Sequence, residues 1–279
     1  MSRFDADPHP LLRPYVRSYW GFERDFSEMP SFTVTPDCFA ELLFFFGRVT
    51  IEDDSRQARL PSCALVPLLN RPIRIVADGV VRCVAVRLYA WGAATIFPEF
   101  SVTRADWQDL SGSFSGESVL EALRRDAWGE IAQLLDALVL KKLGSRRADE
   151  VTVAAITAFL DQSIERPQKH TTEAVASRHG FSTRQVERRV RDLSGLSPKQ
   201  LASLGQLQFV RDALWAHPGS DLRLLAADAG YADQAHMSRQ FRRYTGTTPA
   251  AFKRDCLRLA SFLGSQNVGN LQDERAELG

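Results

Sequence analysis

Arginine and amide side chains stand at helical spacing near the end of the chain. Within residues 230–254, the apolar residues Met237, Phe241 and Tyr244 fall on one face of a predicted helix, and this spacing indicates a buried face. The opposite face carries Gln234, Arg239, Arg242 and Arg243. Guanidinium and amide groups on an exposed helix hydrogen-bond to phosphates and to base edges in the major groove of DNA. An ordinary solvated helix also carries arginines, so this stretch alone leaves both interpretations open.

Capping residues predict the ends of this helix. Gly230 marks a turn, and Asp233 is suited to accept hydrogen bonds from amides two or three residues further on. Gly246 predicts the end of the helix. Thr248 and Pro249 predict the start of the next helix, with Thr as the cap and Pro at the first helical position.

The same pattern occurs twice, which favours a paired motif over a chance surface helix. In each copy a small residue stands four positions before a glycine, an aromatic residue follows the glycine, and a basic residue stands six positions after a capping residue. The matched positions are Ala176 and Ala226, Gly180 and Gly230, Phe181 and Tyr231, Ser182 and Asp233, Arg188 and Arg239, and Val190 and Phe241. Each copy ends in Gly-x-(Ser/Thr)-Pro, at residues 195–198 and 246–249. Small residues let two helices approach and glycine permits the turn between them, so the repeat predicts two helix-turn-helix units and is too short for a solenoid.

A helix is predicted between the two units. Residues 201–217 carry Leu204, Leu207, Val210 and Leu214 at helical spacing, and His-Pro-Gly follows. A helix of about 16 residues spans roughly 24 Å. Such a rod suits two recognition helices placed in major grooves roughly 34 Å apart.

On these residues, the segment from about residue 151 to 254 resembles the DNA-binding domain of the AraC/XylS family of bacterial transcription regulators. The resemblance is carried by Ala226, Gly230, Tyr231, Asp233, Gln234, His236, Ser238, Arg239, Phe241, Arg242, Arg243, Gly246, Thr248 and Pro249. It covers a little over a third of the chain. It implies seven helices, made of one leading helix and two units that share the linker helix.

The resemblance also implies which residues contact DNA. Base-facing positions are Arg184, Glu187, Arg188, Gln234, Ala235, His236 and Arg239. Phosphate-facing positions are Arg189, Arg191, Ser197, Arg242, Arg243 and Thr248. Arginine pairs with guanine O6 and N7, glutamate accepts from cytosine N4, and glutamine suits adenine. Family members often use the position of Arg239 for a phosphate contact or for packing.

Residues 30–110 read as short strands. Stretches such as ELLFFF, VTIEDD, IRIVADG and VRCVAVRLYAW are bounded by Pro, Gly, Asp and Asn, which predicts a mostly antiparallel sheet closed as a barrel or sandwich. Residues 117–143 predict one long amphipathic helix or a pair, whose wide apolar stripe fits packing on the sheet or a dimer interface. Its apolar residues are Leu120, Leu123, Trp128, Ile131, Leu134, Leu135, Leu138 and Val139.

In the family the N-terminal portion is variable and often a cupin-like barrel that senses a small molecule, and residues 8–23 look like a lead-in to such a domain. The expected fold class is α+β, a mostly-β cupin-like barrel or sandwich with helices followed by an all-α double helix-turn-helix domain. We expect an effector-sensing or dimerisation domain at 1–145, a DNA-binding domain at 150–255 and a disordered tail at 265–279.

A ligand of the N-terminal domain would be held by apolar walls and a few polar anchors. Candidate walls are Trp20, Phe22, Phe44, Phe46, Tyr89 and Trp91, although each aromatic residue taken singly is more often core. Candidate anchors for an anion are Arg74 and Arg87, although an arginine in an alternating strand more often faces solvent. None of the five histidines, His9, His170, His179, His217 and His236, lies in the strand region, so we expect no metal site and no cofactor.

Composition favours a cytoplasmic DNA-binding protein. Residues 150–254 hold 15 Lys or Arg and 10 Asp or Glu, a net charge of +5 against +1 for the whole chain. The start is polar, and no apolar run approaches the roughly 20 residues that span a membrane, so no signal peptide and no membrane partner are expected. The four cysteines, Cys38, Cys63, Cys83 and Cys256, lack C-x-x-C spacing and read as thiols of a cytoplasmic protein.

These patterns predict a transcription regulator and not an enzyme. Its expected partners are double-stranded DNA, RNA polymerase, a small-molecule effector and a second copy in a homodimer. One alternative keeps the DNA-binding domain but makes the N-terminal domain a protein-interaction module without a ligand. Another is a DNA-repair protein that accepts methyl groups on a cysteine, against which no cysteine has an activating neighbour in the sequence.

Overall fold

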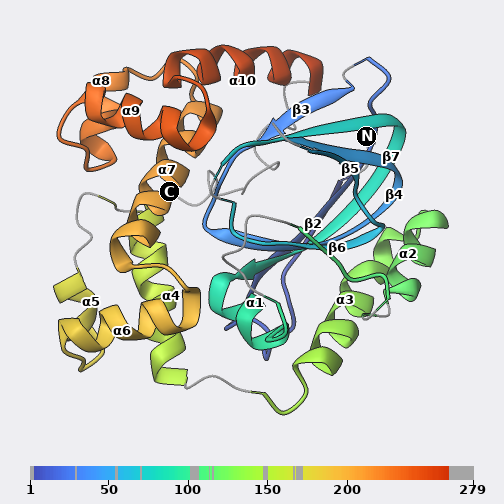
Figure 1. Cartoon of the computed structure of the whole chain (residues 1–279), viewed down its shortest axis with the longest axis horizontal. Coiled ribbons are helices and arrows are strands. Elements are labelled where there is room, and N and C mark those ends of the chain that lie inside the picture. Colours follow the sequence, from blue (N-terminus) through green and yellow to red (C-terminus); the bar gives the residue numbers. More distant parts are fainter. Residues whose placement is uncertain are drawn as a thin grey trace. The chain divides into compact units, whose positions relative to one another are not determined.

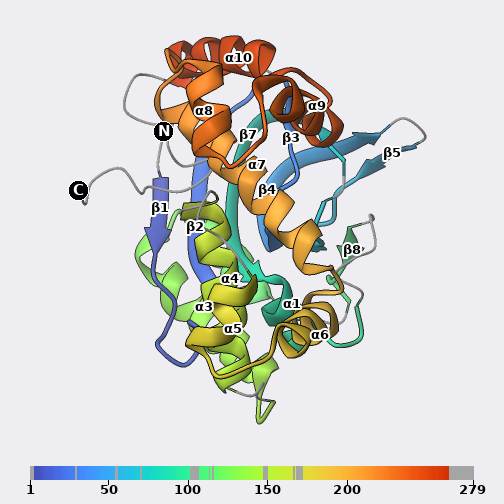
Figure 2. The ribbon, with the colours of Figure 1, turned by 90° about the vertical axis from the view of Figure 1, so that its left-hand side faces the viewer.

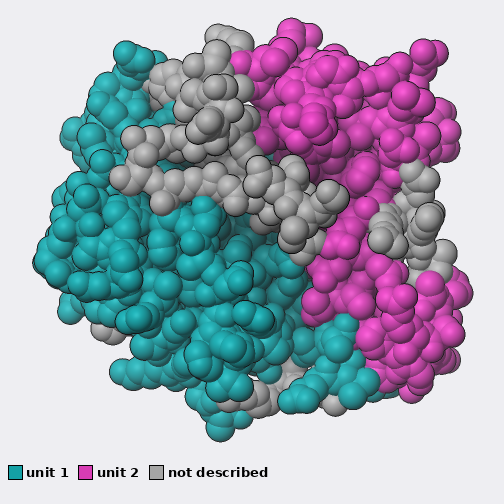
Figure 3. Space-filling model, turned by 180° about the vertical axis from the view of Figure 1, so that it is seen from behind, with its two compact units in different colours: residues 1–35, 39–154, 188–196 teal, residues 36–38, 155–187, 197–279 magenta. Residues whose placement is uncertain are grey.

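The computed structural model describes residues 3–28, 30–53, 56–69, 71–100, 107–112, 114, 116–146, 150–165, 167 and 172–263. The chain forms two compact units, shown in teal and magenta in Figure 3. Unit 1 comprises residues 1–35, 39–154 and 188–196, and unit 2 comprises residues 36–38, 155–187 and 197–279. His170 and the predicted tail at 265–279 lie outside the described residues.

The strands of unit 1 form one eight-stranded sheet in which every pairing is antiparallel (Figure 1). The strand order is β1-β2-β7-β4-β6-β8, with β3 added beside β7 and β5 beside β4. The strands are β1 Arg3–Ala6, β2 Val16–Asp25, β3 Ser31–Val34, β4 Phe39–Asp53, β5 Arg56–Arg59, β6 Cys63–Val66, β7 Ile73–Tyr89 and β8 Gln108–Asp109. The predicted antiparallel sheet of the N-terminal part is therefore confirmed.

Two long strands, β4 and β7, pair along nearly their whole length and form the spine of the sheet. Their register shifts between Phe46 and Arg48, where Gly47 adopts a φ of 132°. A Cβ atom at this glycine would lie 2.9 Å from the Val80 carbonyl oxygen, so a side chain is excluded. The sequence predicted separate strands on either side of this position. The bulge redirects a single strand instead of ending it.

The lead-in predicted at residues 8–23 contains most of β2, a central strand of the sheet. Its alternation is interrupted by a register shift between Val16 and Ser18, and prolines precede it. Because of these two features, the sequence pattern alone does not indicate a strand here.

The sheet is covered by an apolar cluster on one face and by three helices packed beside it. One face holds an apolar cluster that includes Phe26, Phe45, Val49, Ile51, Ile75 and Val81. Helices α1 (Ala90–Ile96), α2 (Glu117–Arg124) and α3 (Trp128–Leu143) pack beside the sheet (Figure 1). Residues 117–143 form two helices because Asp126, with a φ of 59°, breaks the backbone between them. Along α3, Ile131, Leu135, Val139 and Leu143 are fully buried, whereas Leu134 and Leu138 are half-buried.

Seven helices follow in the described part of the chain, as the family resemblance implied (Figure 2). They are α4 Glu150–Glu165, α5 Thr172–Arg178, α6 Thr183–Ser194, α7 Pro198–Ala216, α8 Leu222–Asp228, α9 Gln234–Thr245 and α10 Pro249–Leu263. The linker helix α7 has 19 residues and begins three positions earlier than predicted, which makes it about 28 Å long. None of the described helices is long and apolar enough to cross a membrane.

Linker helix α7 packs closely on α4. A Cβ atom at Gly205 would lie 2.6 Å from the Cβ of Ser163, so only glycine allows this approach. Leu201, Leu204, Leu207, Val210 and Leu214 of α7 are buried. The helix that joins the two helix-turn-helix units therefore has its own apolar face covered.

Candidate nucleic-acid interface

Helix α9 begins and ends where its caps predict. The Asp233 Oδ1 atom accepts a hydrogen bond of 2.6 Å from the backbone N–H of His236. At the other end Gly246 adopts the left-handed conformation, with a φ of 73°, and donates its N–H to the Arg242 carbonyl. The Thr248 hydroxyl accepts from the N–H of Ala251 and caps α10. These contacts fix both ends of α9 and the start of α10.

One face of α9 is buried and the other is free to contact DNA. Met237, Phe241 and Thr245 are buried, and the ring of Phe241 packs edge-on against Phe252 at 5.3 Å. Tyr244, predicted on the buried face, is only half-buried. The exposed side chains are Gln234, Ala235, Arg239, Arg242 and Arg243, which the sequence assigned to this face or to DNA contact.

His236 differs from its neighbours in the first turn of α9. Its side chain is half-buried, and its ring stands edge-on to that of Tyr231, with centroids 5.4 Å apart and planes at 90°. Burial raises the pKa of the Tyr231 hydroxyl well above its ordinary value. The imidazole is thus packed against a neutral ring, and its assignment to base contact stays a prediction.

Helix α6 is built in the same way as α9. The Ser182 N–H donates to Gln185 Oε1 at 2.8 Å, and the Gln185 N–H donates to Ser182 Oγ at 3.3 Å, which satisfies two amides at the helix start. Val186 and Val190 are buried. Gly180 and Gly195 flank the helix with φ of 69° and 70°.

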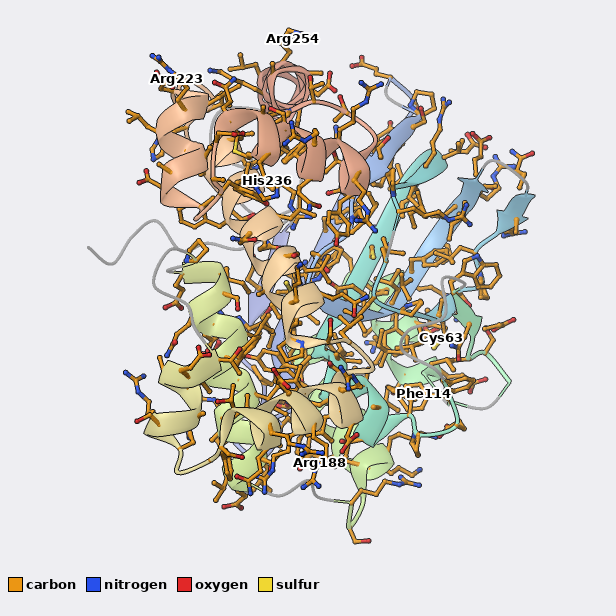
Figure 4. The ribbon with its side chains drawn as sticks, turned by 60° about the vertical axis from the view of Figure 1, so that its left-hand side comes forward. Cys63, Phe114, Arg188, Arg223, His236 and Arg254 are labelled. Atoms are coloured by element: carbon orange, nitrogen blue, oxygen red, sulfur yellow. The ribbon has the colours of Figure 1, made fainter. Side chains whose placement is uncertain are left out.

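The outer face of α6 carries charged side chains. Arg184, Glu187, Arg188 and Arg191 are all exposed, and Figure 4 shows Arg188 projecting away from the helix. Among the residues that the structure describes, none of these four side chains makes an ion pair. Their polar groups are therefore available to phosphates and bases.

Three predicted phosphate contacts are already engaged within the protein. Arg189 is half-buried and donates its Nη1 to Thr152 Oγ1 of α4. The Ser197 hydroxyl donates to Gln200 Oε1 at 2.8 Å and accepts from the Gln200 N–H, and Thr248 is a cap. A phosphate contact of the Ser197 hydroxyl would therefore replace its bond to Gln200, whereas Thr248 accepts in its cap and can still donate its O–H to a phosphate.

Four further exposed cations lie on the helices around α6 and α9 and were not among the predicted contacts. They are Arg178 of α5, Lys199 of α7, Arg223 of α8 and Arg254 of α10. Figure 4 shows Arg223 and Arg254 directed outward. Helical periodicity applied to α8 and α10 would have found Arg223 and Arg254, because each lies opposite a buried residue of its helix.

Comparison with known proteins bears on this part of the chain. Residues 175–255 match a family model described as a helix-turn-helix domain. These residues form an AraC-type helix-turn-helix domain. The AraC-type domain thus takes in both recognition helices, α6 and α9, together with α7 and α8.

Other comparisons extend beyond the AraC-type domain. Residues 5–106 match a domain of unknown function (DUF6597), and no curated protein matches the chain. Among solved structures, ToxT from Vibrio cholerae O395 is 10% identical, with a TM-score of 0.48 and coverage of 85% of this chain and 98% of that one. An AraC-type regulator from Chromobacterium violaceum is 19% identical, with a TM-score of 0.34 and coverage of 38% and 91%. A DNA-binding transcriptional dual regulator from Escherichia coli K-12 is 19% identical, with a TM-score of 0.33 and coverage of 39% and 99%.

The candidate ligand residues outside the AraC-type domain do not share one surface. Trp20, Phe22, Arg87 and Tyr89 point to the same face of the sheet. Trp20 and Phe22 pair with Ala85 and Cys83 of β7, and Arg87 and Tyr89 follow Ala85 at steps of two residues along that strand. The other four lie elsewhere. Phe44 is fully buried beside Phe114, Phe46 is 48% exposed, Arg74 is exposed and bonded to Ser31, and Trp91 lies in α1 with its indole N–H donated to the Pro14 carbonyl.

Arg87 does not face solvent, contrary to the expectation for an alternating strand. Its side chain is 4% exposed, and its Nε donates to Glu41 Oε1 at 2.8 Å. The other oxygen of Glu41 accepts from the indole N–H of Trp20 at 3.1 Å, and the guanidinium lies over the ring of Phe39. An anionic ligand would have to compete with this internal pair for Arg87.

The four cysteines are buried free thiols. Burial raises the pKa of Cys63 and of Cys256 to about 12. A thiol with so high a pKa stays protonated near neutral pH and is a weak nucleophile. In the described ranges, no three His, Cys, Asp or Glu side chains are grouped as metal ligands.

Proposed function

We propose that this protein is a sequence-specific DNA-binding transcription regulator in which α6 and α9 read successive major grooves. The main support is that α6 and α9 have 12 residues each and are flanked by the same pattern of capping residues and glycines. Each helix exposes a face that carries arginines and buries an apolar face. The linker α7 gives the pair a span of about 28 Å, close to the roughly 34 Å between successive major grooves. The expected cytoplasmic location follows from this role.

Control of DNA binding is assigned to the N-terminal part. The face of the sheet that carries Trp20, Phe22 and Tyr89 is rich in aromatic side chains, which suits a small apolar effector. A protein partner bound to the same part is the second candidate, supported by the internal pairing of Arg87 with Glu41, which occupies the charged groups that an anionic effector would use. RNA polymerase and a second copy of the chain complete the proposed partners.

The DNA-binding proposal is tested by titrating the full-length protein with DNA flanking its own gene across a salt series. Binding is expected to be selective for sequence and to weaken steeply with salt, because each phosphate contact contributes a slope of roughly 0.9 in log–log form. Arg188→Ala is expected to weaken specific binding by about 1 to 3 kcal/mol. Arg242→Ala is expected to weaken binding to all sequences and to lower the salt slope by about one.

Lys141→Ala is the matched control, because Lys141 is an exposed cation on α3, outside the AraC-type domain. It should leave both affinity and slope unchanged. Binding that is indifferent to both sequence and salt would refute the proposal.

The two modes of control are separated by a thermal-shift panel of small metabolites. An effector present at 100 times its dissociation constant stabilises the domain that binds it by about 2.7 kcal/mol. Such a shift, abolished by Trp20→Ala and retained by Arg223→Ala, supports small-molecule control. Binding of a protein partner to the full chain, with no metabolite shift, supports the interaction module.

Methyl transfer to a cysteine is disfavoured by the burial of the thiols and by the raised pKa of Cys63 and Cys256. Incubation with methylated DNA followed by intact-mass measurement tests this alternative. We expect no gain of a methyl group.

A further inference from the structure

The two recognition helices differ in the chemistry of the faces that they expose. On α6, Arg184, Glu187, Arg188 and Arg191 stand at positions i, i+3, i+4 and i+7, so they form one stripe along the helix. All four are exposed, and none is held by an ion pair within the described ranges. Charge is therefore present from the first turn of α6 onward.

The first turn of α9 exposes only uncharged side chains. Gln234 and Ala235 are exposed, whereas the ring of His236 is packed edge-on against Tyr231. Arg239, one turn beyond Ala235, is the first cation on this face, and the other arginines of α9 follow in its last turn. Positive charge on α9 thus begins at Arg239, after the first turn of the helix.

These side chains match different base pairs. A helix-turn-helix presents the N-terminal residues of its second helix to base edges. Arginine at this position pairs with guanine O6 and N7, and glutamate accepts from cytosine N4, so α6 offers partners for both members of a G·C pair. Glutamine pairs with adenine N6 and N7, and the alanine methyl group packs on the thymine methyl, so α9 offers partners for an A·T pair.

From this difference we infer that the two halves of the DNA target differ in base composition. This inference rests on the proposed function. The half-site that faces α6 is read through G·C pairs, and the half-site that faces α9 is read through A·T pairs. Arg239 and the last-turn arginines of α9 hold the phosphates that flank the A·T half. The orientation of the protein on its operator is then set by base composition alone.

Selection from a randomised duplex library with the full-length protein tests this inference. The expected product is a two-part consensus with G·C pairs in one part and A·T pairs in the other. Arg188→Ala should erase the preference in the G·C part only, and Gln234→Ala should erase it in the A·T part only. Arg242→Ala is the control, because loss of a phosphate contact should leave the consensus unchanged.

Base analogues then report the contacts at single atoms. Replacing guanine by 7-deazaguanine in the selected site removes the N7 acceptor while leaving base pairing intact. Affinity should fall at least about fivefold, the lower end of what a bidentate pair contributes. The Arg188→Ala or Arg184→Ala variant should show no further loss at the guanine that it reads. Replacing thymine by uracil in the other part removes the methyl group expected to pack on Ala235.

The outcomes distinguish this inference from the function on which it rests. A selected consensus with the same composition in both parts, or one unchanged by Arg188→Ala and Arg184→Ala, overturns the inference and leaves sequence-specific DNA binding intact. Failure to enrich any sequence overturns the proposed function as well. All the substituted side chains are exposed, so equal urea midpoints and circular dichroism spectra are expected and verify that each variant is folded.

Discussion

The buried pair of Arg87 and Glu41 makes a quantitative prediction about the N-terminal part. Arg87 is 4% exposed and Glu41 is 14% exposed, and 2.8 Å separates Arg87 Nε from Glu41 Oε1. Removing the guanidinium leaves a carboxylate buried without its counter-charge. Such a loss costs about 3 to 5 kcal/mol of the free energy of unfolding. We expect this loss for Arg87→Met, which keeps most of the aliphatic volume.

A double-mutant cycle shows whether the loss comes from the uncompensated charge. Glu41→Gln removes the charge but keeps a side-chain oxygen that can accept from the Trp20 indole N–H, the contact now 3.1 Å long. With both substitutions no charge remains buried, so the double variant should be more stable than Arg87→Met alone by about 2 kcal/mol or more.

Urea unfolding of the full chain, followed by tryptophan fluorescence, is the assay. Four of the five tryptophans, at positions 20, 91, 107 and 128, lie in unit 1, so the signal reports mainly the part that holds the pair. Strict additivity of the two single substitutions would refute the reasoning, since it would mean that the two groups do not sense each other's charge.

Three further predictions concern caps, close packing and thiols. Asp233→Ala should cost about 1 kcal/mol in the urea midpoint and weaken DNA binding, because the first turn of α9 loses its cap, whereas Asp233→Asn should retain most of both. Gly205→Ala should destabilise the chain by about 1 to 3 kcal/mol, because its Cβ would lie 2.6 Å from the Cβ of Ser163. The control Gly129→Ala, at an open helical position, should stabilise the chain by about 0.5 to 1 kcal/mol. A destabilised Gly129→Ala variant or an unaffected Gly205→Ala variant would contradict the packing. A thiol reagent at pH 8 should react only slowly with the native protein, because a pKa of about 12 keeps a group such as Cys256 protonated at that pH. After denaturation the same reagent should label all four thiols. Rapid labelling of the native protein would contradict the burial of the thiols.

The ends of the recognition helices are properties of the local sequence. Asp233, Gly246 and Thr248 act on amides and carbonyls within four residues of themselves, and the structure places each contact where those residue types predict it. The same holds for the repeat, since two copies of one pattern specify two copies of one local fold. The exposed face of α9 follows from this information alone, whereas the number of helices was implied by the family resemblance.

Tertiary structure decided which polar side chains are free. Arg87 and Arg74 lie in the same alternating strand, yet one is paired inside the protein and the other is exposed. Likewise Arg189 is engaged by Thr152 of another helix, whereas Arg188 beside it is not held. In each case the partner lies 30 or more positions away in the sequence, so helical or strand periodicity carries no information about it.

The continuity of strand β4 also depends on tertiary structure. Residues 39–53 form one strand because β7 pairs with both halves of it across the bulge at Gly47. The sequence around that glycine reads as a break, and the two halves are continuous only through a partner strand that begins about 20 residues later. The sequence by itself therefore determined the local elements and their caps. Long-range pairing and burial determined which charged side chains remain available for DNA, because the residues that cover those side chains lie far away in the chain.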